Sequence, residues 1–332
     1  MKFIAILIPL ASAVLAVPSN GDKCTAPETR VEWGSLTPAQ RNSYHNAIKC
    51  LQTKPSGEEG VSVYDRFAKN HVDFFSSIHY VAAFLPWHRY YSHARFGLMK
   101  DCGYDGPNTY WDWTKDVNNM ASSEIFHPTK GFGGTGKRST SNGATYTCIA
   151  DGPYSSRSNF TISWPEKRCL QRNFNMQSSK GSWWRPATGP STRHSQSQID
   201  TINKNTKFTD FWPALEEGPH DSVHNEINSD MAASFSPDDP LFFLHHNNVD
   251  RLWALWQGRD QQRLADYAGN TMQGQALTDK SRYPTASLND TIDIGMASLG
   301  YPTVKVRDLM DTQSSLLCYK ASTTILIINT LC

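Results

Sequence analysis

Four stretches of the chain carry apolar side chains every three or four residues, which is the spacing of one helix face. In the first, Thr37 is placed to cap the helix, Pro38 suits its first turn, and Gln40 completes a capping box. The other three each have a proline in the first turn: LPWHRYYSHARFGLMKDC from Pro86, GPHDSVHNEI with Pro219, and DDPLFFLHHNNVDRLWALWQ with Asp239 as cap and Pro240 next. The pattern predicts a mainly α protein with a helical centre.

Residues 130–210 lack this spacing and are predicted to be mostly loop. The clearest case is KGFGGTGKRSTSNGATYTC (130–148), which is rich in Gly, Ser and Thr. Long loops in a compact domain are usually functional or cross-linked. Seven cysteines allow three disulfides with one cysteine left over. We expect Cys148 to pair with Cys169, because the two flank one loop-like stretch; the other pairings do not follow from the sequence.

The chain opens with MKFIAILIPLASAVLAVPSN, which has one lysine, an apolar run and then small residues up to Ala16. This pattern is typical of a secretory signal peptide cleaved after Ala16, and the run is too short to span a membrane. We therefore expect a signal peptide at 1–16, one domain at 17–320 and an atypical tail at 321–332. A secreted, extracellular protein suits the cysteines, and it makes Asn159 and Asn289 candidate glycosylation sites.

Charge narrows the range of partners. The 332 residues include 32 Lys and Arg against 31 Asp and Glu, for a net charge of +1. This balance gives no electrostatic reason to expect nucleic acid or an anionic membrane as a partner. Aromatic residues make up 11% of the chain, and composition does not distinguish a large aromatic core from a site that binds flat ligands.

Histidines gather in two clusters, one made of His71, His79 and His88 and the other of His220, His224, His245 and His246. A single helical histidine is more often a packed or surface residue than a ligand. However, His220 and His224 are four residues apart and share a helix face, so they can reach one atom. Imidazole suits Zn, Cu, Fe and Ni. A zinc hydrolase needs only one trio, whereas two trios favour two copies of one metal. Copper fits, because both its oxidation states accept nitrogen and secretion exposes the site to dioxygen.

Four motifs resemble the type-3 copper family, and more closely its short secreted fungal tyrosinases and catechol oxidases. They are FLPWHRYY, YWDW, LEEGPHDSVHNEI and DPLFFLHHNNVDRLW, and the likeness covers roughly residues 24–320. The resemblance implies a tyrosinase-like central four-helix bundle that holds a dicopper site, surrounded by long disulfide-stapled loops. It implies two copper ions, the first bound by His71, His79 and His88 and the second by His220, His224 and His246. His245 would then pack beside the second site.

The resemblance also implies roles for four residues near these ligands. Glu216 and Asn225 stand where the family holds a water near the coppers that assists phenol deprotonation, although a helix dipole also favours a carboxylate at a helix N-terminus. Asp221 would face the entrance, where it repels acidic substrates, attracts amines or is simply solvated. Phe242 stands where the family stacks an aromatic ring against the substrate, and a plain core residue is the alternative.

Asp250 follows His246 by one helical turn and admits two interpretations. It is the acceptor that orients the imidazole of His246, or it forms a salt bridge with Arg89 or Arg251.

The resemblance implies an oxidoreductase that uses O₂ to convert o-diphenols to o-quinones, with some monooxygenase activity on monophenols. We expect small phenols as its substrates, no nucleic acid or membrane partner, and a monomer or dimer. A haemocyanin-like oxygen carrier is the alternative, but it needs a covering group over the site that a single domain of about 300 residues lacks. A copper-free relative is a third interpretation, and the presence of all six histidines argues against it.

Overall fold

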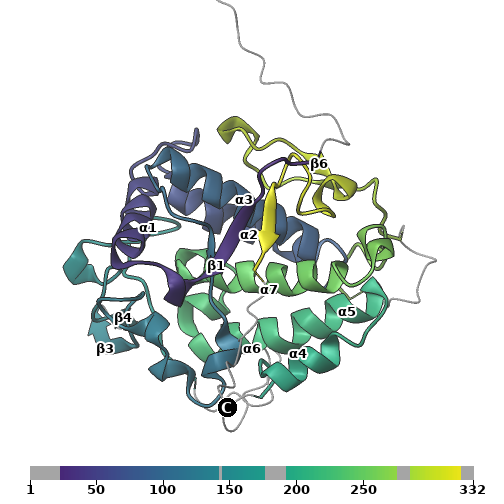
Figure 1. Ribbon diagram of the computed structural model, residues 1–332. Helices are drawn as coiled ribbons and strands as arrows, with labels where there is room; N and C mark the ends of the chain where they lie inside the picture. The colour runs from purple at the N-terminus through teal and green to yellow at the C-terminus, as the bar shows by residue number, and fades with distance from the viewer. Residues whose placement is uncertain (1–22, 142–143, 176–191, 275–284, 323–332) are drawn as a thin grey trace, which may run out of the picture.

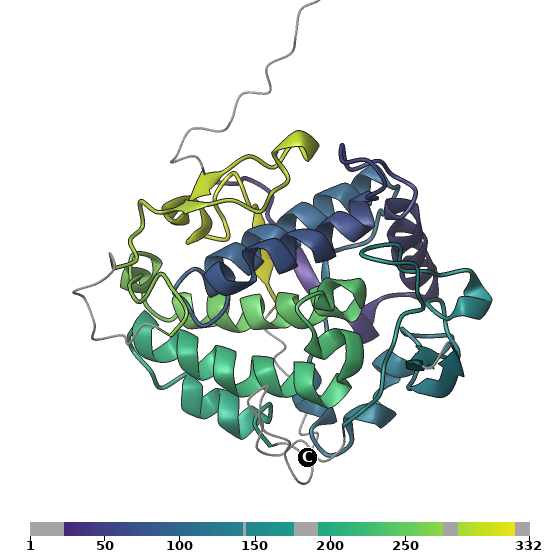
Figure 2. The same ribbon diagram turned by 180° about the vertical axis from the view of Figure 1, so that it is seen from behind.

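Helices cross at the centre of the molecule (Figure 1, Figure 2). The computed structural model describes residues 23–141, 144–175, 192–274 and 285–322. Its helices are α1 (Pro38–Leu51), α2 (Val63–Ile78), α3 (Phe84–Asp101), α4 (Gln196–Ile202), α5 (Phe208–Leu215), α6 (Asp221–Ile227) and α7 (Leu241–Gln257). All of α7 except Ala254 and Leu255 is buried, as expected for a helix enclosed on every side. The predicted mainly α fold with a helical centre is confirmed.

Three of the four predicted helix starts agree closely with the structure. The capping box of α1 is complete, since Thr37 accepts from the Gln40 backbone and the Gln40 side chain accepts from the Thr37 backbone. Helix α3 begins at Phe84, two residues before Pro86, which remains in the first turn. At α7 the start is as predicted, but the N-cap is Pro240 and not Asp239. Asp239 lies one residue earlier, where its carboxylate accepts a hydrogen bond from the Leu241 backbone N–H at 3.1 Å.

The predicted start near Pro219 is wrong, because helical structure already begins at Phe208. Between α5 and α6 lies one π-helical turn, η6 (Glu216–His220). Proline inside a helix lacks an N–H donor and crowds the carbonyl four residues earlier. A wider turn relieves that crowding, and such turns are frequent at functional sites. Pro219 therefore marks a widened turn within a longer helical run.

Three short strands join the two ends of the described chain. Strand β1 (Glu28–Glu32) lies between β2 (Thr109–Tyr110) and β7 (Tyr319–Ala321) and is parallel to both. In Figure 1 the β7 arrow crosses in front of α7. A further antiparallel pair is formed by β5 (Thr291–Ile292) and β6 (Val304–Lys305). The pairing of β1 with β7 thus brings together segments about 290 residues apart along the chain, beside the central helix α7.

The stretch predicted as loop at 130–148 contains a β-hairpin, so that prediction was wrong in part. Strands β3 (Gly136–Ser141) and β4 (Ala144–Ile149) pair antiparallel from Gly136 with Ile149 to Ser141 with Ala144. The second strand carries Thr, Tyr and Ile, which favour extended backbone. The loop prediction treated Ser and Thr only as loop-forming residues, so it overlooked the preference of Thr, Tyr and Ile for extended backbone.

The disulfide between Cys148 and Cys169 is confirmed. Two further bridges, Cys24–Cys318 and Cys50–Cys102, were not deducible from the sequence. The seventh cysteine, Cys332, lies outside the described residues, as do the predicted signal peptide and most of the tail.

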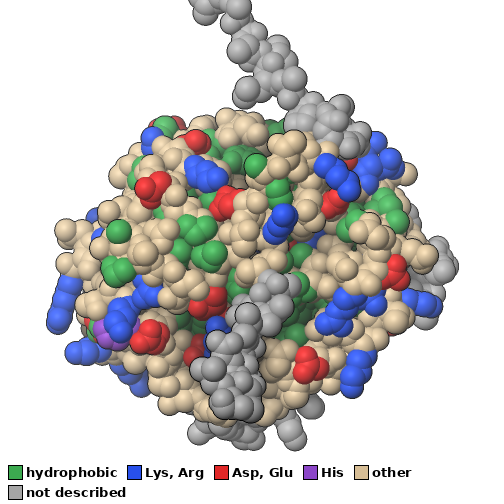
Figure 3. Space-filling view, in the orientation of Figure 1, with side chains coloured by type: hydrophobic (Ala, Val, Ile, Leu, Met, Phe, Trp, Pro, Cys, Tyr) green, Lys and Arg blue, Asp and Glu red, His purple; other side chains and the backbone are tan. Residues whose placement is uncertain are grey.

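The surface shows no large area of a single charge on the face in Figure 3, where basic and acidic side chains are interspersed. Both candidate glycosylation residues, Asn159 and Asn289, are exposed, and their modification stays a prediction. In the part of the chain that the structure describes, no helix combines the length and apolar character that a membrane crossing needs.

Candidate metal centre

The two histidine clusters of the sequence become two compact groups in the structure. His71, His79 and His88 form one, and His220, His224, His245 and His246 form the other; within each group the nitrogens that could bind a metal lie within 4.8 Å of one another. The rings of His88 and His246 stack at 4.3 Å between centroids, and those of His79 and His220 at 6.2 Å. The two groups therefore adjoin.

Each group draws its histidines from different helices. His71 is in α2, His79 directly follows the last residue of α2, and His88 is in α3. His220 ends the π turn and His224 follows one turn later in α6, so the widened turn sets their relative direction. His245 and His246 come from the middle of α7.

Five of the six predicted ligands use Nδ1 to contact a backbone carbonyl oxygen. The pairs are His71 with Ser234 (2.6 Å), His79 with Phe75 (3.1 Å), His88 with Phe84 (2.8 Å), His220 with Glu216 (3.2 Å) and His224 with Met231 (2.5 Å). A carbonyl can only accept, so Nδ1 carries the proton in each ring. The other nitrogen, Nε2, is then left as an acceptor with a free lone pair.

These Nε2 atoms have the chemistry of metal ligands. Those of His71, His88 and His220 are buried and have no hydrogen-bond partner among the described residues. A buried acceptor without a partner is costly, and a cation bound by several of them removes that cost. Burial also lowers the pKa of all six rings, to about 3 for His79, His220 and His224, so they are neutral at pH 7. Neutral imidazole is the form that binds Cu or Zn, and the residues fit the two copper ions that the resemblance implies.

The two adjacent histidines of α7 both belong to the second group, but they have different neighbours. The ring of His246 contacts His88 and Phe84 of the first side as well as His220, and its Nε2 lies 3.3 Å from Nε2 of His224. His245 contacts His220, His224 and Trp113, and neither of its ring nitrogens has a partner among the described residues. His246 is the better placed to meet both groups, and its choice as ligand stays a proposal.

Asp250 does not orient His246. Its carboxylate accepts from Arg89 Nε at 2.5 Å, from Arg30 Nη1 at 2.6 Å and from the Tyr319 hydroxyl. These cations hold the pKa of the buried carboxyl below its usual value, against the effect of burial. The salt-bridge interpretation with Arg89 is therefore correct, and Asp250 joins β1, α3, α7 and β7. Nδ1 of His246 has no partner among the described residues.

Glu216 is fully buried in the π turn and is not at a helix N-terminus, so the helix-dipole interpretation is wrong. One carboxylate oxygen accepts from the Tyr80 backbone N–H and the other from Trp212 Nε1, each at 2.7 Å. Burial raises the pKa of this carboxyl well above its usual value. A carboxylate has about four acceptor positions, so two remain after these contacts.

A cavity of about 70 Å³ opens beside the two groups. It is lined by His71, Phe75, His79, Tyr80, His220, Asp221, His224, Asn225, Met231, Ala232, Ala233 and Ser236. Asn225 and Asp221 are thus among the residues that line the cavity. Asp221 is buried rather than simply solvated, and burial raises its pKa to about 6. Phe242 is fully buried and is not among the lining residues; its ring packs 4.1 Å from that of His246.

Tyr80 is a cavity residue that the sequence did not single out. Its backbone has a φ of 54°, which is rare for a bulky residue. Its N–H donates to Glu216, and its hydroxyl donates to Asp221 at 3.0 Å. The residue therefore links the loop after His79 to both acidic groups beside His220. Its position directly after a predicted ligand was the only signal in the sequence.

Comparison with known proteins gives consistent results. The model of the common central domain of tyrosinase matches residues 61–259, a range that contains all seven of these histidines. The tyrosinase-like protein phomQ1 of Diaporthe leptostromiformis is 33% identical over 321 residues, covering 90% of this chain and 78% of that protein. Tyrosinase ustQ of Aspergillus flavus is 32% identical over 305 residues, covering 89% and 80%. The solved structure of a mutant polyphenol oxidase from Thermothelomyces thermophila superposes with a TM-score of 0.70 at 25% identity, covering 91% of each chain.

Proposed function

Since this chain belongs to the tyrosinase family of copper oxidases, we propose that it uses dioxygen to oxidise o-diphenols to o-quinones and hydroxylates monophenols more slowly. The observation that carries the proposal is the pair of adjoining histidine groups with Nε2 lone pairs directed away from their carbonyl partners. We propose His71, His79 and His88 as ligands of one copper and His220, His224 and His246 as ligands of the other.

The reaction needs a metal pair for its redox step. When bound, two coppers supply the electron transfer by which dioxygen and two diphenols become two quinones and two waters. The chain keeps the imidazoles neutral through burial, and it fixes the direction of five of them through carbonyl acceptors. Asn225, Asp221 and Tyr80 form the polar wall of the cavity, where we propose that they orient the phenol hydroxyl group.

Hydroxylation of a monophenol first requires loss of its proton. We propose that Glu216 assists this step by holding a water with its two remaining acceptor positions, together with the Asn225 amide. The raised pKa of the carboxyl supports the assignment, because a base whose pKa lies nearer the working pH transfers protons more effectively. Asp221, on the same wall, places a carboxyl group near the substrate and favours amines such as tyramine over acidic phenols.

The test is an assay of the copper-loaded full chain on catechol, tyramine and tyrosol, with oxygen uptake and quinone absorbance as readouts. We expect rapid turnover of catechol and slower turnover of both monophenols after a trace of diphenol is added. We expect His224→Ala to lower the rate of catechol oxidation by more than about 100-fold, because loss of a residue that only supports a ligand typically costs about 10–100-fold. Circular dichroism should show that the variant keeps its fold.

The possible outcomes separate the alternatives. Two bound coppers without catechol turnover would favour an oxygen-binding protein. Failure to bind copper would favour a copper-free relative, and full activity of His224→Ala would contradict the ligand assignment. If catechol turns over but neither monophenol does, the protein is a catechol oxidase only.

We also propose that the protein is secreted. Three disulfides among the described residues are typical of an oxidising compartment. Detection of the mature chain in culture medium, with its N-terminus after Ala16, is the expected result.

A further inference from the structure

Two ligand histidines differ from the others in where their orienting carbonyl comes from. His79, His88 and His220 each use the carbonyl four residues earlier in their own helical run. His71 and His224 instead use the carbonyls of Ser234 and Met231. Both acceptors lie in residues 229–240, which we call the carbonyl loop. One ligand of each proposed copper therefore depends on the position of the same loop.

The carbonyl loop has little regular structure to hold its shape. It contains two 3₁₀ turns, η7 (Ser229–Ala232) and η8 (Ser236–Asp238). Its entry is strained, because Asn228 and Ser229 have φ values of 60° and 51° in succession. Such conformations persist only where surrounding structure over-determines them. The loop also supplies part of the cavity wall, so a shift would alter both ligand direction and cavity shape.

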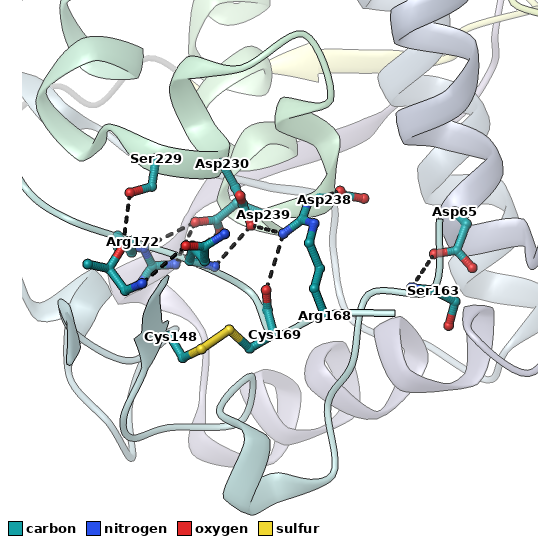
Figure 4. Close-up of polar contacts among 12 residues, drawn as sticks. Asp65, Cys148, Ser163, Arg168, Cys169, Arg172, Ser229, Asp230, Asp238 and Asp239 are labelled. Carbon is teal, nitrogen blue, oxygen red and sulfur yellow. Dashed lines mark hydrogen bonds and ion pairs between the residues drawn. A yellow bond between two sulfur atoms is a disulfide. The ribbon is translucent and has the colours of Figure 1, made fainter. Parts of the chain in front are cut away.

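Arg168 bridges the two ends of this loop (Figure 4). Its Nη1 donates to Asp230 Oδ2 and its Nη2 to Asp238 Oδ2, each at 2.6 Å. The three side chains are at most 9% exposed, and the guanidinium also lies 4.9 Å from the ring centre of Phe235, in the middle of the loop. A planar guanidinium with fixed donor directions suits such a bridge better than a lysine ammonium does.

Arg168 is itself held by a fixed strip of chain, residues 168–172. The strip is tied to β4 by the Cys148–Cys169 disulfide and by backbone hydrogen bonds from Ile149 to Leu170 and from Arg172 to Thr147. At its other end, Arg172 makes a fully buried ion pair with Asp239, at the end of the carbonyl loop. The strip thus presents two cations to the three carboxylates of the loop.

We propose that Arg168 is a positioning residue of the dicopper centre. By holding Asp230 and Asp238, it fixes the carbonyls of Met231 and Ser234 and so the directions of His224 and His71. This role rests on the proposed copper site. Without the guanidinium, two buried carboxylates lose their shared cation, and the strained loop loses the contact that spans it.

The experiment compares Arg168→Gln and Arg168→Lys in the full chain. Each protein is loaded with Cu(I) under argon, and its copper affinity is measured by competition with a coloured Cu(I) chelator. We expect Arg168→Gln to weaken copper binding 10–100-fold, the range typical of outer-shell partners. Both copper equivalents should be affected, whereas His224→Ala should affect one. Arg168→Lys keeps the positive charge but lacks the fixed donor directions of the guanidinium. Its copper affinity should therefore lie between those of wild type and Arg168→Gln.

The matched control is Ile48→Ala, a cavity-forming change at a fully buried position in α1. It lowers the thermal midpoint without contacting the carbonyl loop, and it should retain wild-type copper affinity. Equal loss of copper in this control would show that the effect of Arg168 is one of general stability and would overturn the proposal. Unchanged affinity in folded Arg168→Gln would also overturn it.

A second variant covers the case in which Arg168→Gln does not fold. Asp238→Asn keeps Arg168 and its bond to Asp230 but weakens one arm of the bridge, and it should weaken copper binding more than Ile48→Ala does. Wild-type affinity in Asp238→Asn would contradict the proposal. A wild-type protein that binds fewer than two coppers would instead contradict the proposed function, so the two failures are distinguishable.

Discussion

At the scale of single residues, the metal centre depends on which nitrogen of each imidazole carries its proton. The sequence indicated the six histidines, but it did not show which ring nitrogen would be free. An acceptor at Nδ1 fixes the proton there and leaves the Nε2 lone pair free for a metal. Backbone carbonyls provide that acceptor for five rings. Side-chain carboxylates do not take this role for His246, since Asp250 is committed to Arg30 and Arg89.

The substitution Glu216→Gln should affect monophenol hydroxylation much more than catechol oxidation. The substitution keeps the size of the side chain but removes its ability to take up a proton. We expect monophenol hydroxylation to fall by about 10²–10⁴-fold, the usual contribution of a positioned acid or base, with catechol oxidation reduced less than about 10-fold. The measurement is the ratio of kcat/KM for tyramine and catechol.

The neighbouring Glu217→Gln is the matched control, because Glu217 is exposed. It should leave the tyramine-to-catechol ratio unchanged. An equal fall for both substrates in Glu216→Gln would show that the residue acts only by holding Tyr80 and Trp212 in place.

At the scale of elements, the hairpin β3–β4 and the strip beside it connect the outer loops to the metal centre. The sequence identified the Cys148–Cys169 pair. It did not indicate that this disulfide joins β4 to the strip that carries Arg168 and Arg172. Figure 4 shows the disulfide beside Arg168, whose side chain reaches the acidic residues of the carbonyl loop. We therefore propose that the stapled loop supports the carbonyl loop.

Removing the Cys148–Cys169 bridge should affect both stability and copper binding. The bridge spans 21 residues, and a loop of this length is worth roughly 3 kcal/mol of unfolding free energy through the entropy of the unfolded chain. We expect the double variant Cys148→Ser with Cys169→Ser to lose about that amount in urea unfolding. We also expect it to bind Cu(I) more weakly.

The double variant Cys50→Ser with Cys102→Ser tests whether the second effect is local. That bridge joins the ends of α1 and α3 and does not touch the strip. It should lower stability while leaving copper affinity at the wild-type value. Copper affinity that falls equally in both pairs would argue against a local support role.

At the scale of the whole molecule, burial of many neutral imidazoles makes stability depend on pH. His45 is a case clear of the metal centre: it is 8% exposed, contacts the Tyr154 hydroxyl at 2.7 Å, and has its pKa lowered to about 3 by burial and then by Lys49 and Arg41. In the unfolded chain a histidine has a pKa of about 6.5. Between these values the unfolded state binds one more proton, so stability falls as the pH is lowered.

The expected slope is testable with His45→Gln. One such histidine changes the free energy of unfolding by about 1.4 kcal/mol per pH unit below pH 6.5. Urea unfolding of the metal-free protein at pH 7, 6 and 5 should show a pH dependence shallower by this amount in His45→Gln than in wild type. His127→Gln, at an exposed position, should match wild type. Identical slopes in all three proteins would mean that His45 is not buried in its neutral form.

Local sequence rules predicted much of the helical framework. The capping box of Thr37 and Gln40 was predicted correctly, because such signals act within one helical turn. The start of α7 was also predicted, although its N-cap is Pro240 and not Asp239. The early start at Phe208 was missed, since a proline was read as a start signal where the chain has a π turn. The hairpin was missed because composition was weighed above strand preference.

The sequence by itself determined the histidine spacing, the family and one disulfide, because these depend on residues close together in the chain or on motifs read directly from it. Only the tertiary structure decided which groups orient the imidazoles, what Asp250 contacts and how Arg168 holds the carbonyl loop. Asp250 and Arg89 are 161 residues apart, and Arg168 and Asp238 are 70 apart. Periodicity cannot determine such contacts, because they arise only when separate helices and loops pack together and exclude water.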